Sequence, residues 1–334
     1  MRAFEYASPT TKEQAVGLLG ASWGQAEVLA GGTDLLSLMK DDVVHPRRVV
    51  NIKQIKEMNG VAPGPKGLRI GALTTLGELA DNVNVVKDYP ALAEAINDAA
   101  SPQIRNMATL GGNICQRPRC WYFRGGFGLL PKSEAGKDLV TNGENRYHAI
   151  LGNDGPAKFV SPSSIAPVLI AYGAVLRLVG PQGTREQSLE HFYVIPKSEN
   201  QREHDLKSNE ILAEVILPPT RNLRVAHYEL RQKEAFDWPL AVVAVALNMN
   251  GSELFGSRLV LGYVAPIPWR AGDGETALNR AARAHGSITE EAAKAAAEGA
   301  LQTATPLSHN AYKVQLAKVA VKRVIMKAAS GSAA

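Results

Sequence analysis

The chain has 334 residues, of which 45% are hydrophobic, and this length predicts two or three domains of roughly 100–200 residues each. Its 37 basic and 32 acidic residues give a net charge of +5 but are interspersed without a long basic block, which argues against a nucleic-acid-binding protein. No run of about 18 apolar residues occurs and no apolar signal segment follows Met1, so we expect a cytoplasmic protein without a membrane span.

Residues 1–60 are predicted to form a small α/β unit. A short strand at 4–6 precedes a helix within 10–19, which begins at a threonine N-cap. Further strands are expected at 27–30 and 49–52. The alternation of strands and helices indicates a small parallel or mixed sheet.

Two short glycine-containing segments are the most informative features of the sequence. Residues 30–35 read Ala-Gly-Gly-Thr-Asp-Leu and join a strand to a predicted helix, and residues 109–113 read Thr-Leu-Gly-Gly-Asn. Glycine permits positive φ angles and lets an anion approach the backbone N–H groups. One such segment is most often an ordinary tight turn. Two of them with different flanks favour a phosphate-bearing cofactor held by backbone amides.

The region 61–219 is predicted as a second unit. We interpret its Pro- and Gly-rich segment 62–67 as a linker that precedes a strand at 68–72. A capping box of Thr74 or Thr75 with Glu78 predicts a helix to about residue 80. Further predicted elements are helices at 89–100 and 167–171, strands at 174–179 and 211–217, and a boundary at Pro218 and Pro219.

Arg105 and Asn106 directly precede the second glycine segment. They are placed within reach of whatever that segment binds. The alternative is a helix terminus, at which Arg105 donates to a carbonyl group and Asn106 acts as a cap. The sequence alone favours neither interpretation.

Residues 114–160 form an insertion that combines aromatic residues with arginines. Trp121, Tyr122 and Phe123 stand beside Arg117, Arg119 and Arg124, with Arg146 further along. This composition is typical of a partner surface, and a loop packed on its own domain is the alternative.

The only two cysteines of the sequence, Cys115 and Cys120, also lie in this insertion. Two thiols exclude a disulfide framework and cannot supply the four ligands that an iron–sulfur cluster normally takes. A zinc site with His148 or His191 is the weaker alternative, because isolated histidines are more often structural.

Residues 220–330 are predicted as a third unit with an antiparallel sheet and helices. The expected strands are at 224–231, 240–249 and 259–264, and the expected helices at 275–284, 289–301 and 311–328. Alanine is frequent in these helices and carries little functional information.

With these motifs in this order, the chain resembles the FAD-binding medium subunits of the molybdenum hydroxylases, the family of xanthine dehydrogenase, carbon monoxide dehydrogenase and aldehyde oxidoreductase. The resemblance rests on segments 30–35, 68–75, 104–114 and 161–164 and covers nearly the whole chain. It implies an α+β protein with FAD between two N-terminal α/β subdomains of the vanillyl-alcohol-oxidase-like (PCMH) type, residues 1–60 and 61–219. Residues 220–330 would be a C-terminal α+β domain of the CO dehydrogenase flavoprotein type.

The resemblance also implies a set of FAD-binding residues, with no catalytic side chain and no metal ligand in this chain. They are Leu29, Ala30, Gly31, Gly32, Thr33, Asp34, Leu35, Ala72, Arg105, Thr109, Gly111, Gly112, Asn113, Ser164 and Lys233. Ser164 stands where the family often has Asp, and its hydroxyl can donate or accept a hydrogen bond there. Lys233 is placed near the flavin ring, beside the family-like segment 234–239.

Within the family, the insertion is most similar to that of aldehyde oxidoreductase medium subunits, where it can carry a four-iron cluster on four cysteines. The matching string is Gln-Arg-Pro-Arg-Cys-Trp-Tyr-Phe-Arg at 116–124. Only Cys120 matches a cluster ligand, and Lys158 stands where a later cysteine is expected. We therefore expect the insertion without a [4Fe-4S] cluster.

The resemblance implies electron transfer within a heterotrimer. A large subunit with a molybdenum cofactor would oxidise the substrate, a small subunit with [2Fe-2S] clusters would relay electrons, and FAD here would pass them to an external acceptor. The substrate and acceptor are left open. Alternatives are a scaffold subunit that has lost FAD, and a free-standing oxidase whose flavin is covalently bound, for instance at Cys115. Export with a signal-bearing partner is the alternative to a cytoplasmic location.

Overall fold

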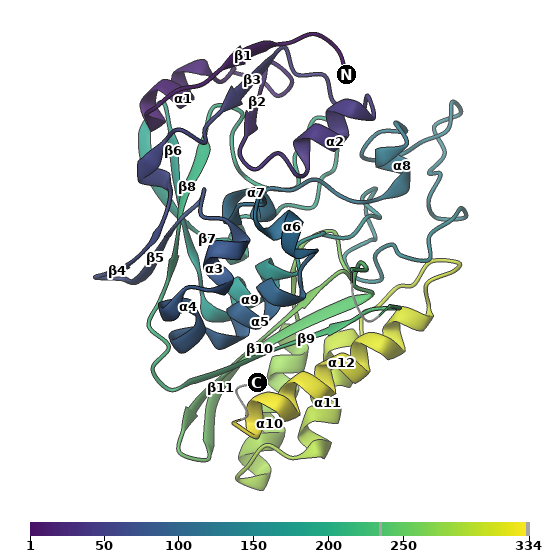
Figure 1. Ribbon diagram of the computed structural model, residues 1–334. Coiled ribbons are helices and arrows are strands. Elements are labelled where there is room, and N and C mark those ends of the chain that lie inside the picture. Colours follow the sequence, from purple (N-terminus) through teal and green to yellow (C-terminus); the bar gives the residue numbers. More distant parts are fainter. Residues whose placement is uncertain (234–235, 332–334) are drawn as a thin grey trace.

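The computed structural model describes residues 1–233 and 236–331, which form three sheets with their helices (Figure 1). The three sheets have three, five and four strands. One continuous apolar core joins the first two sheets to one face of the third, and a second core lies on the opposite face of the third sheet. The mixed α+β class predicted from the sequence is confirmed.

The N-terminal unit is a small parallel sheet, one of the two forms, parallel or mixed, that the sequence predicts. Its elements are β1 (Glu5–Ala7), α1 (Lys12–Leu18), β2 (Ala26–Leu29), α2 (Leu35–Lys40) and β3 (Arg48–Asn51), with strand order β1-β3-β2. The Thr11 side chain caps α1 by accepting a hydrogen bond from the backbone of Gln14 at 3.2 Å. A short 3₁₀ turn, η1 (Lys56–Met58), leads out of this unit.

The second sheet is antiparallel and has the strand order β4-β5-β8-β6-β7. Its strands are β4 (Val61–Gly64), β5 (Gly67–Gly71), β6 (Val175–Gly180), β7 (Gly183–Ser188) and β8 (Ile211–Leu217), with the 3₁₀ turn η2 (Leu189–His191) after β7. The predicted linker at 62–67 is therefore wrong, because these residues form a β-hairpin. Pro63 is tolerated because β4 is an edge strand. Gly67, with φ of 121°, is required because a Cβ there would lie 2.0 Å from the Leu217 carbonyl oxygen.

Short helices pack beside this sheet. They are α3 (Leu76–Ala80), α4 (Val83–Asp88), α5 (Pro90–Asp98), α6 (Pro102–Arg105), α7 (Leu110–Ile114) and α9 (Ile165–Tyr172). The predicted capping box is present: Thr75 Oγ1 accepts from the Glu78 amide, and Glu78 Oε2 accepts from the Thr75 amide. All eight residues of α9 are buried, because this helix lies between the second sheet and the C-terminal sheet.

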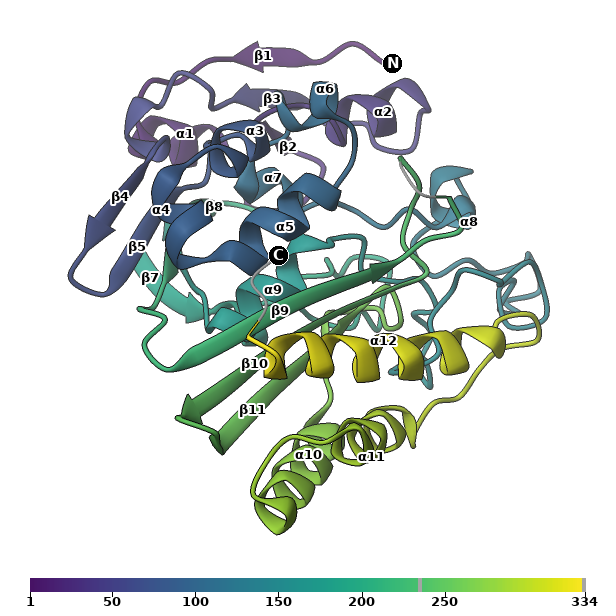
Figure 2. The ribbon, with the colours of Figure 1, turned by 60° about the horizontal axis from the view of Figure 1, so that its bottom comes forward.

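The C-terminal unit is an antiparallel sheet with strand order β12-β11-β10-β9, as predicted for its three long strands. The strands are β9 (Leu223–Leu230), β10 (Ala241–Asn250), β11 (Glu253–Gly262) and β12 (Trp269–Arg270). The helices α10 (Gly272–His285), α11 (Glu290–Leu301) and α12 (Tyr312–Ala329) cover one face, and α5 and α9 lie on the other (Figure 2). The three predicted helices are confirmed.

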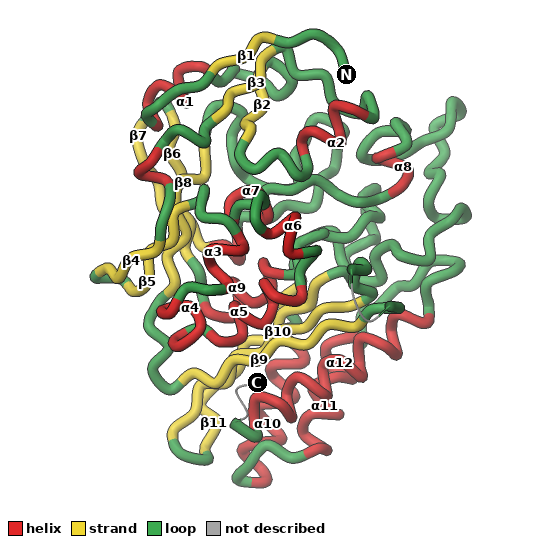
Figure 3. Tube along the Cα trace, viewed as in Figure 1, coloured by secondary structure: helices red, strands yellow, loops and turns green. Residues whose placement is uncertain are grey.

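The insertion is mostly irregular and contains one short helix, α8 (Trp121–Arg124) (Figure 3). Side chains from the segment before α12 hold it in place: Asn310 Nδ2 donates to the carbonyl oxygens of His148 and Ala149, at 3.1 and 3.2 Å. None of the helices in the described part of the chain combines the length and apolar character that crossing a membrane requires.

Candidate functional site

A cavity of about 160 Å³ lies where the N-terminal unit meets α7 and the second sheet. Many of the predicted cofactor-binding residues line it: Ala30, Gly31, Gly32, Thr33, Asp34, Leu35, Ala72, Thr109, Gly111 and Gly112. A second cavity of about 1020 Å³ adjoins it and shares Trp23, Glu27 and Arg117 among its walls. The two cavities together offer the space that a small-molecule cofactor needs.

The first glycine segment presents unpaired backbone donors to the cavity. Among the hydrogen bonds of the described residues, none is donated by the backbone amides of residues 31–35. Gly32 adopts a φ of 78°, and a Cβ on Gly31 would lie 1.8 Å from the carbonyl oxygen of Met107. Both glycines are therefore needed for the conformation of this segment.

The second glycine segment is not a turn between elements, because it forms the first turn of α7. The Thr109 side chain caps this helix by accepting from the Gly112 amide at 3.1 Å. The amides of Leu110 and Gly111 donate to the carbonyl oxygens of Thr74 and Ala72. The amides of residues 110–113 are thus satisfied internally. A Cβ on Gly111 would lie 2.9 Å from that of Ala72, so glycine here permits close packing of α7 against the strand end.

Five predicted residues do not line the cavity. Leu29 ends β2, and Lys233 is exposed in the connection that follows β9. Asn113 Oδ1 accepts a hydrogen bond from the hydroxyl of Ser163 at 2.6 Å, which links α7 to the segment that carries the buried Ser164. Arg105 occupies the structural alternative: its Nη1 donates to the carbonyl oxygens of residues 97, 99 and 100 at 3.0–3.1 Å. Of the segment 234–239, residues 234 and 235 lie outside the described residues.

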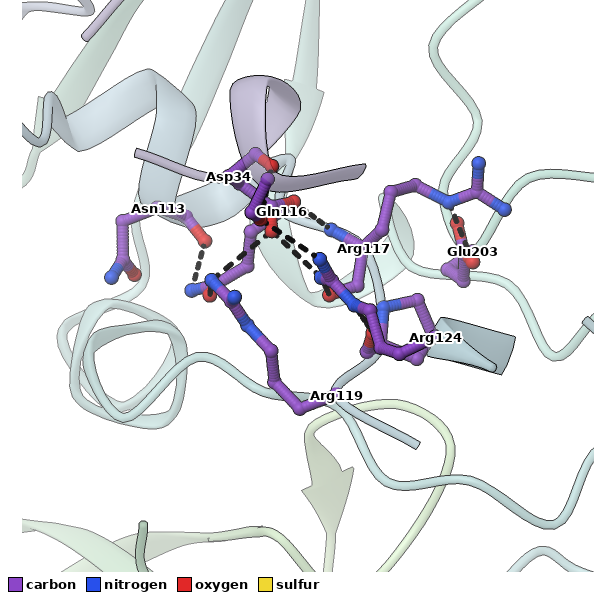
Figure 4. Close-up of polar contacts among 9 residues, drawn as sticks. Asp34, Asn113, Gln116, Arg117, Arg119, Arg124 and Glu203 are labelled. Carbon is purple, nitrogen blue, oxygen red and sulfur yellow. Dashed lines mark hydrogen bonds and ion pairs between the residues drawn. The ribbon is translucent and has the colours of Figure 1, made fainter. Parts of the chain in front are cut away.

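Asp34 is the point at which the insertion meets the first glycine segment (Figure 4). Its Oδ2 accepts from the Arg117 backbone amide at 2.8 Å, and its Oδ1 lies 2.7 Å from Arg124 Nη2 and 3.1 Å from Arg119 Nη2. The Asp34 side chain is only 16% exposed, so these contacts replace water. These arginines thus pack on their own chain, which was the alternative to a partner surface.

A polar loop after β7 supplies wall residues that the sequence analysis did not identify. Arg202 forms an ion pair with Glu27 and lies 4.3 Å from the centre of the Trp23 ring. His204 stacks on Phe192 at 5.2 Å, and burial together with the nearby Arg202 and Arg117 lowers its pKa to about 3. No glycine motif or apolar periodicity marks this loop, so only the fold brings it to the cavity.

The two cysteines lie near the site but do not form a metal centre. The Cys120 sulfur is 3.2 Å from His148 Nε2, and no group of three or more potential His, Cys, Asp or Glu ligands occurs within residues 1–233 and 236–331. Burial raises the pKa of the Cys115 thiol, which lines the cavity, to about 12. This thiol is therefore protonated at neutral pH and is a poor nucleophile.

Comparisons with known families match the chain in two parts. Residues 2–220 match the FAD binding domain in molybdopterin dehydrogenase, and residues 226–328 match the CO dehydrogenase flavoprotein C-terminal domain. The chain is 30% identical over 330 residues to the aldehyde oxidoreductase FAD-binding subunit PaoB of Escherichia coli, covering 98% of this chain and 99% of that protein.

Two further comparisons agree in length and fold. The carbon monoxide dehydrogenase medium chain of Hydrogenophaga pseudoflava is 30% identical over 96% of both chains. A solved structure of carbon monoxide dehydrogenase from the same organism, which lacks the Mo-pyranopterin moiety, superposes with a TM-score of 0.76 at 28% identity and covers 98% of both chains. Quinoline 2-oxidoreductase from Pseudomonas putida shares the fold, with a TM-score of 0.75 at 23% identity and coverage of 100% of this chain and 99% of that one.

Proposed function

The chain belongs to the family of FAD-binding medium subunits of the molybdenum hydroxylases, and from this membership we propose that it carries electrons within a complex of that class. A large subunit with a molybdenum cofactor would oxidise the substrate, and a small subunit with [2Fe-2S] clusters would deliver the electrons to FAD. The FAD would then pass them to an external acceptor. The chain would act in the cytoplasm or be exported with a signal-bearing partner.

The residues of the cavity fit FAD. The unpaired amides of residues 31–35 match the oxygens of a diphosphate, which needs several convergent donors. Apolar wall residues such as Leu19, Leu73 and Leu212 suit an aromatic ring system. The charged walls supply guanidinium groups from Arg117 and Arg202. We propose that the first glycine segment holds the diphosphate and that Thr109, Gly111 and Gly112 form the opposing wall.

FAD supplies the redox chemistry, because its isoalloxazine ring accepts and releases electron pairs or single electrons. The task of this chain is to bind, orient and shield that ring. We propose that the residues that do not line the cavity act indirectly: Asn113 through its hydrogen bond with Ser163, and Ser164 from a buried position behind α7. We also propose that Lys233 places a positive charge near the flavin ring.

The alternative of a scaffold subunit without FAD gains no support. Gly31 and Gly32 keep a conformation that a larger residue would not adopt without rearrangement, and the amides of residues 31–35, which line a cavity, donate no hydrogen bond within the described part of the chain. Unpaired backbone donors are unfavourable unless water or a ligand satisfies them. A protein that has lost its cofactor would have no reason to keep this arrangement, so the open amides are the single observation that carries the proposal.

The first experiment is the visible absorption spectrum of the purified chain before and after acid precipitation, with identification of the released chromophore and measurement of iron. We expect two flavin bands that move to the supernatant as FAD, together with no iron in the isolated chain. A colourless protein that takes up no added FAD would refute the proposed function. Flavin that stays in the precipitate would indicate the covalent alternative, for which Cys115 lines the cavity. Co-purification with two partner subunits then tests the complex.

A further inference from the structure

The charges around Asp34 do not balance. Its carboxylate carries one negative charge, and the guanidinium groups of Arg119 and Arg124 both lie within 3.1 Å of its Oδ1 atom. Arg117 contributes its backbone amide, but its own guanidinium is paired with Glu203 at 2.9 Å. Two positive charges thus face one negative charge directly beside the open amides of the first glycine segment, and the site has an excess of one positive charge.

The two arginines differ in how completely they are bonded. Arg124 donates from Nε to the Pro118 carbonyl oxygen at 2.8 Å and from Nη2 to Asp34 at 2.7 Å, and its Nη1 lies 3.4 Å from the Ser37 hydroxyl. Its donors are engaged by the chain itself. Arg124 is therefore part of the structure that fixes the Asp34 side chain.

Arg119 is less completely bonded. Its Nη2 donates to Gln116 Oε1 at 3.3 Å and faces Asp34, but its Nε is buried and has no partner among the described residues. The guanidinium lies 4.9 Å from the centre of the Trp238 ring. Burial lowers the pKa of Arg119, as expected for a cation whose charge is incompletely compensated. The excess positive charge is therefore assigned to Arg119.

We propose that Arg119 is a positioning residue for the cofactor: with Asp34 already paired to Arg124, Arg119 supplies the excess positive charge beside the first glycine segment, so that this segment accepts a diphosphate. Asp34 and Gln116 line the cavity, whereas Arg119 does not. The Arg119 guanidinium donates a hydrogen bond to Gln116 and forms an ion pair with Asp34. Without Arg119, the charges of Asp34 and Arg124 balance, and the site loses the net positive charge that attracts an anion to the adjacent amides. The proposal gives the insertion a role as part of the cofactor site. It rests on the proposed function, because the diphosphate is that of FAD.

The test uses the full chain, stripped of flavin and titrated with FAD at several ionic strengths. The variant is Arg119→Gln, and the matched control is Arg146→Gln, which removes an exposed arginine of the same insertion whose partner is Glu144. We expect Arg119→Gln to raise the FAD dissociation constant about tenfold at low salt, with a smaller difference at high salt because screening weakens a charge effect. Arg146→Gln should bind FAD like the unchanged chain.

A rescue experiment separates a charge effect from misfolding. Asp34→Asn combined with Arg119→Gln should bring the dissociation constant back to within about threefold of the unchanged chain, since Arg124 then has no carboxylate partner and the excess of one positive charge is restored. Arg119→Lys should keep most of the affinity, because it keeps the charge. Equal affinities of Arg119→Gln and the unchanged chain at every ionic strength would refute the inference. A weaker affinity that neither depends on salt nor recovers in the double variant would also refute it. Failure of the unchanged chain to bind FAD would instead refute the proposed function.

Discussion

The side-chain nitrogen of Lys313 lies 2.6 Å from the carbonyl oxygen of Tyr263, a residue whose φ of 62° is unusual for a side chain of this size. Lys313 is 1% exposed and also donates to the carbonyl oxygens of Tyr147 and His148, at 3.2 and 3.1 Å. One buried ammonium group at the start of α12 therefore joins the insertion to the end of β11. This connection fixes residues 147–148 of the insertion against the C-terminal unit.

We expect Lys313→Met to lower the free energy of unfolding by about 2 kcal/mol, because three carbonyl groups inside the protein lose their hydrogen-bond donor. The relief of burying a charge offsets part of this loss. Denaturant unfolding at neutral pH measures the effect. Lys322→Met is the control, because this lysine forms an exposed ion pair with Glu290 and its removal should change stability by less than about 0.5 kcal/mol. Equal changes in both variants would contradict the role of Lys313.

Gly31→Ala should abolish FAD binding. An alanine Cβ at this position would lie 1.8 Å from the carbonyl oxygen of Met107, so the first glycine segment must move and its amides lose their convergence. FAD content after purification, measured by absorption, reports the effect. Gly17→Ala is the matched control, because Gly17 lies within α1 with open space around it and alanine stabilises a helix by about 0.5–1 kcal/mol. Full FAD content in the Gly31→Ala variant would show that the close contact is not needed.

The sequence was sufficient to predict that the first glycine segment joins a strand to a helix, and to predict most helices and strands, because these features depend on local patterns. Thr11, Thr75 and Glu78 are caps whose partners lie three residues away. The three long C-terminal strands follow from apolar runs, whose side chains are buried in the two cores on the faces of the sheet. The segment 62–67 was misread because proline and glycine are typical both of linkers and of a hairpin at a sheet edge.

The contacts of the site itself could not be predicted, because they join residues that are far apart in the chain. Asp34 meets Arg117 and Arg124 across 83 and 90 positions. The pair of Arg202 with Glu27 spans 175 positions. No local pattern encodes such pairs. The composition of the insertion therefore marked it as unusual, but it did not show that its arginines contact Asp34. Arg105 shows the converse: its proximity in sequence suggested a cofactor contact, whereas its guanidinium bonds nearby carbonyl groups.

Acid should destabilise the protein through His204. Its pKa is lowered to about 3 in the folded state, so between pH 6.5 and about 3 the unfolded chain binds a proton that the folded chain does not. The free energy of unfolding therefore falls as the pH falls through this range. Burial also lowers the pKa of His148, to about 4, which adds to the effect over most of the same range. Stability measured against pH should show both contributions.

His204→Gln should make the loss of stability with falling pH shallower, since it removes one of the groups that bind a proton only on unfolding. Denaturant unfolding at several values between pH 6.5 and about 4.5 measures the slope, which is independent of any constant loss from the missing ring stack with Phe192. His285→Gln, at an exposed position, is the control and should keep the slope of the unchanged chain. An unchanged slope in the His204 variant would show that this histidine is not the acid-sensitive group.

Removal of FAD should lower the stability of the chain, because a ligand that binds only the folded state shifts the unfolding equilibrium. At a FAD concentration one hundred times its dissociation constant, the free energy of unfolding should exceed that of the flavin-free chain by about 2.7 kcal/mol. Melting temperatures of the flavin-free chain with and without FAD test this. Riboflavin at the same concentration is the matched control, because it lacks the diphosphate for which the amides of residues 31–35 are unpaired. Equal stabilisation by riboflavin and FAD would contradict the assignment of these amides to the diphosphate, whereas stabilisation by FAD alone would support it.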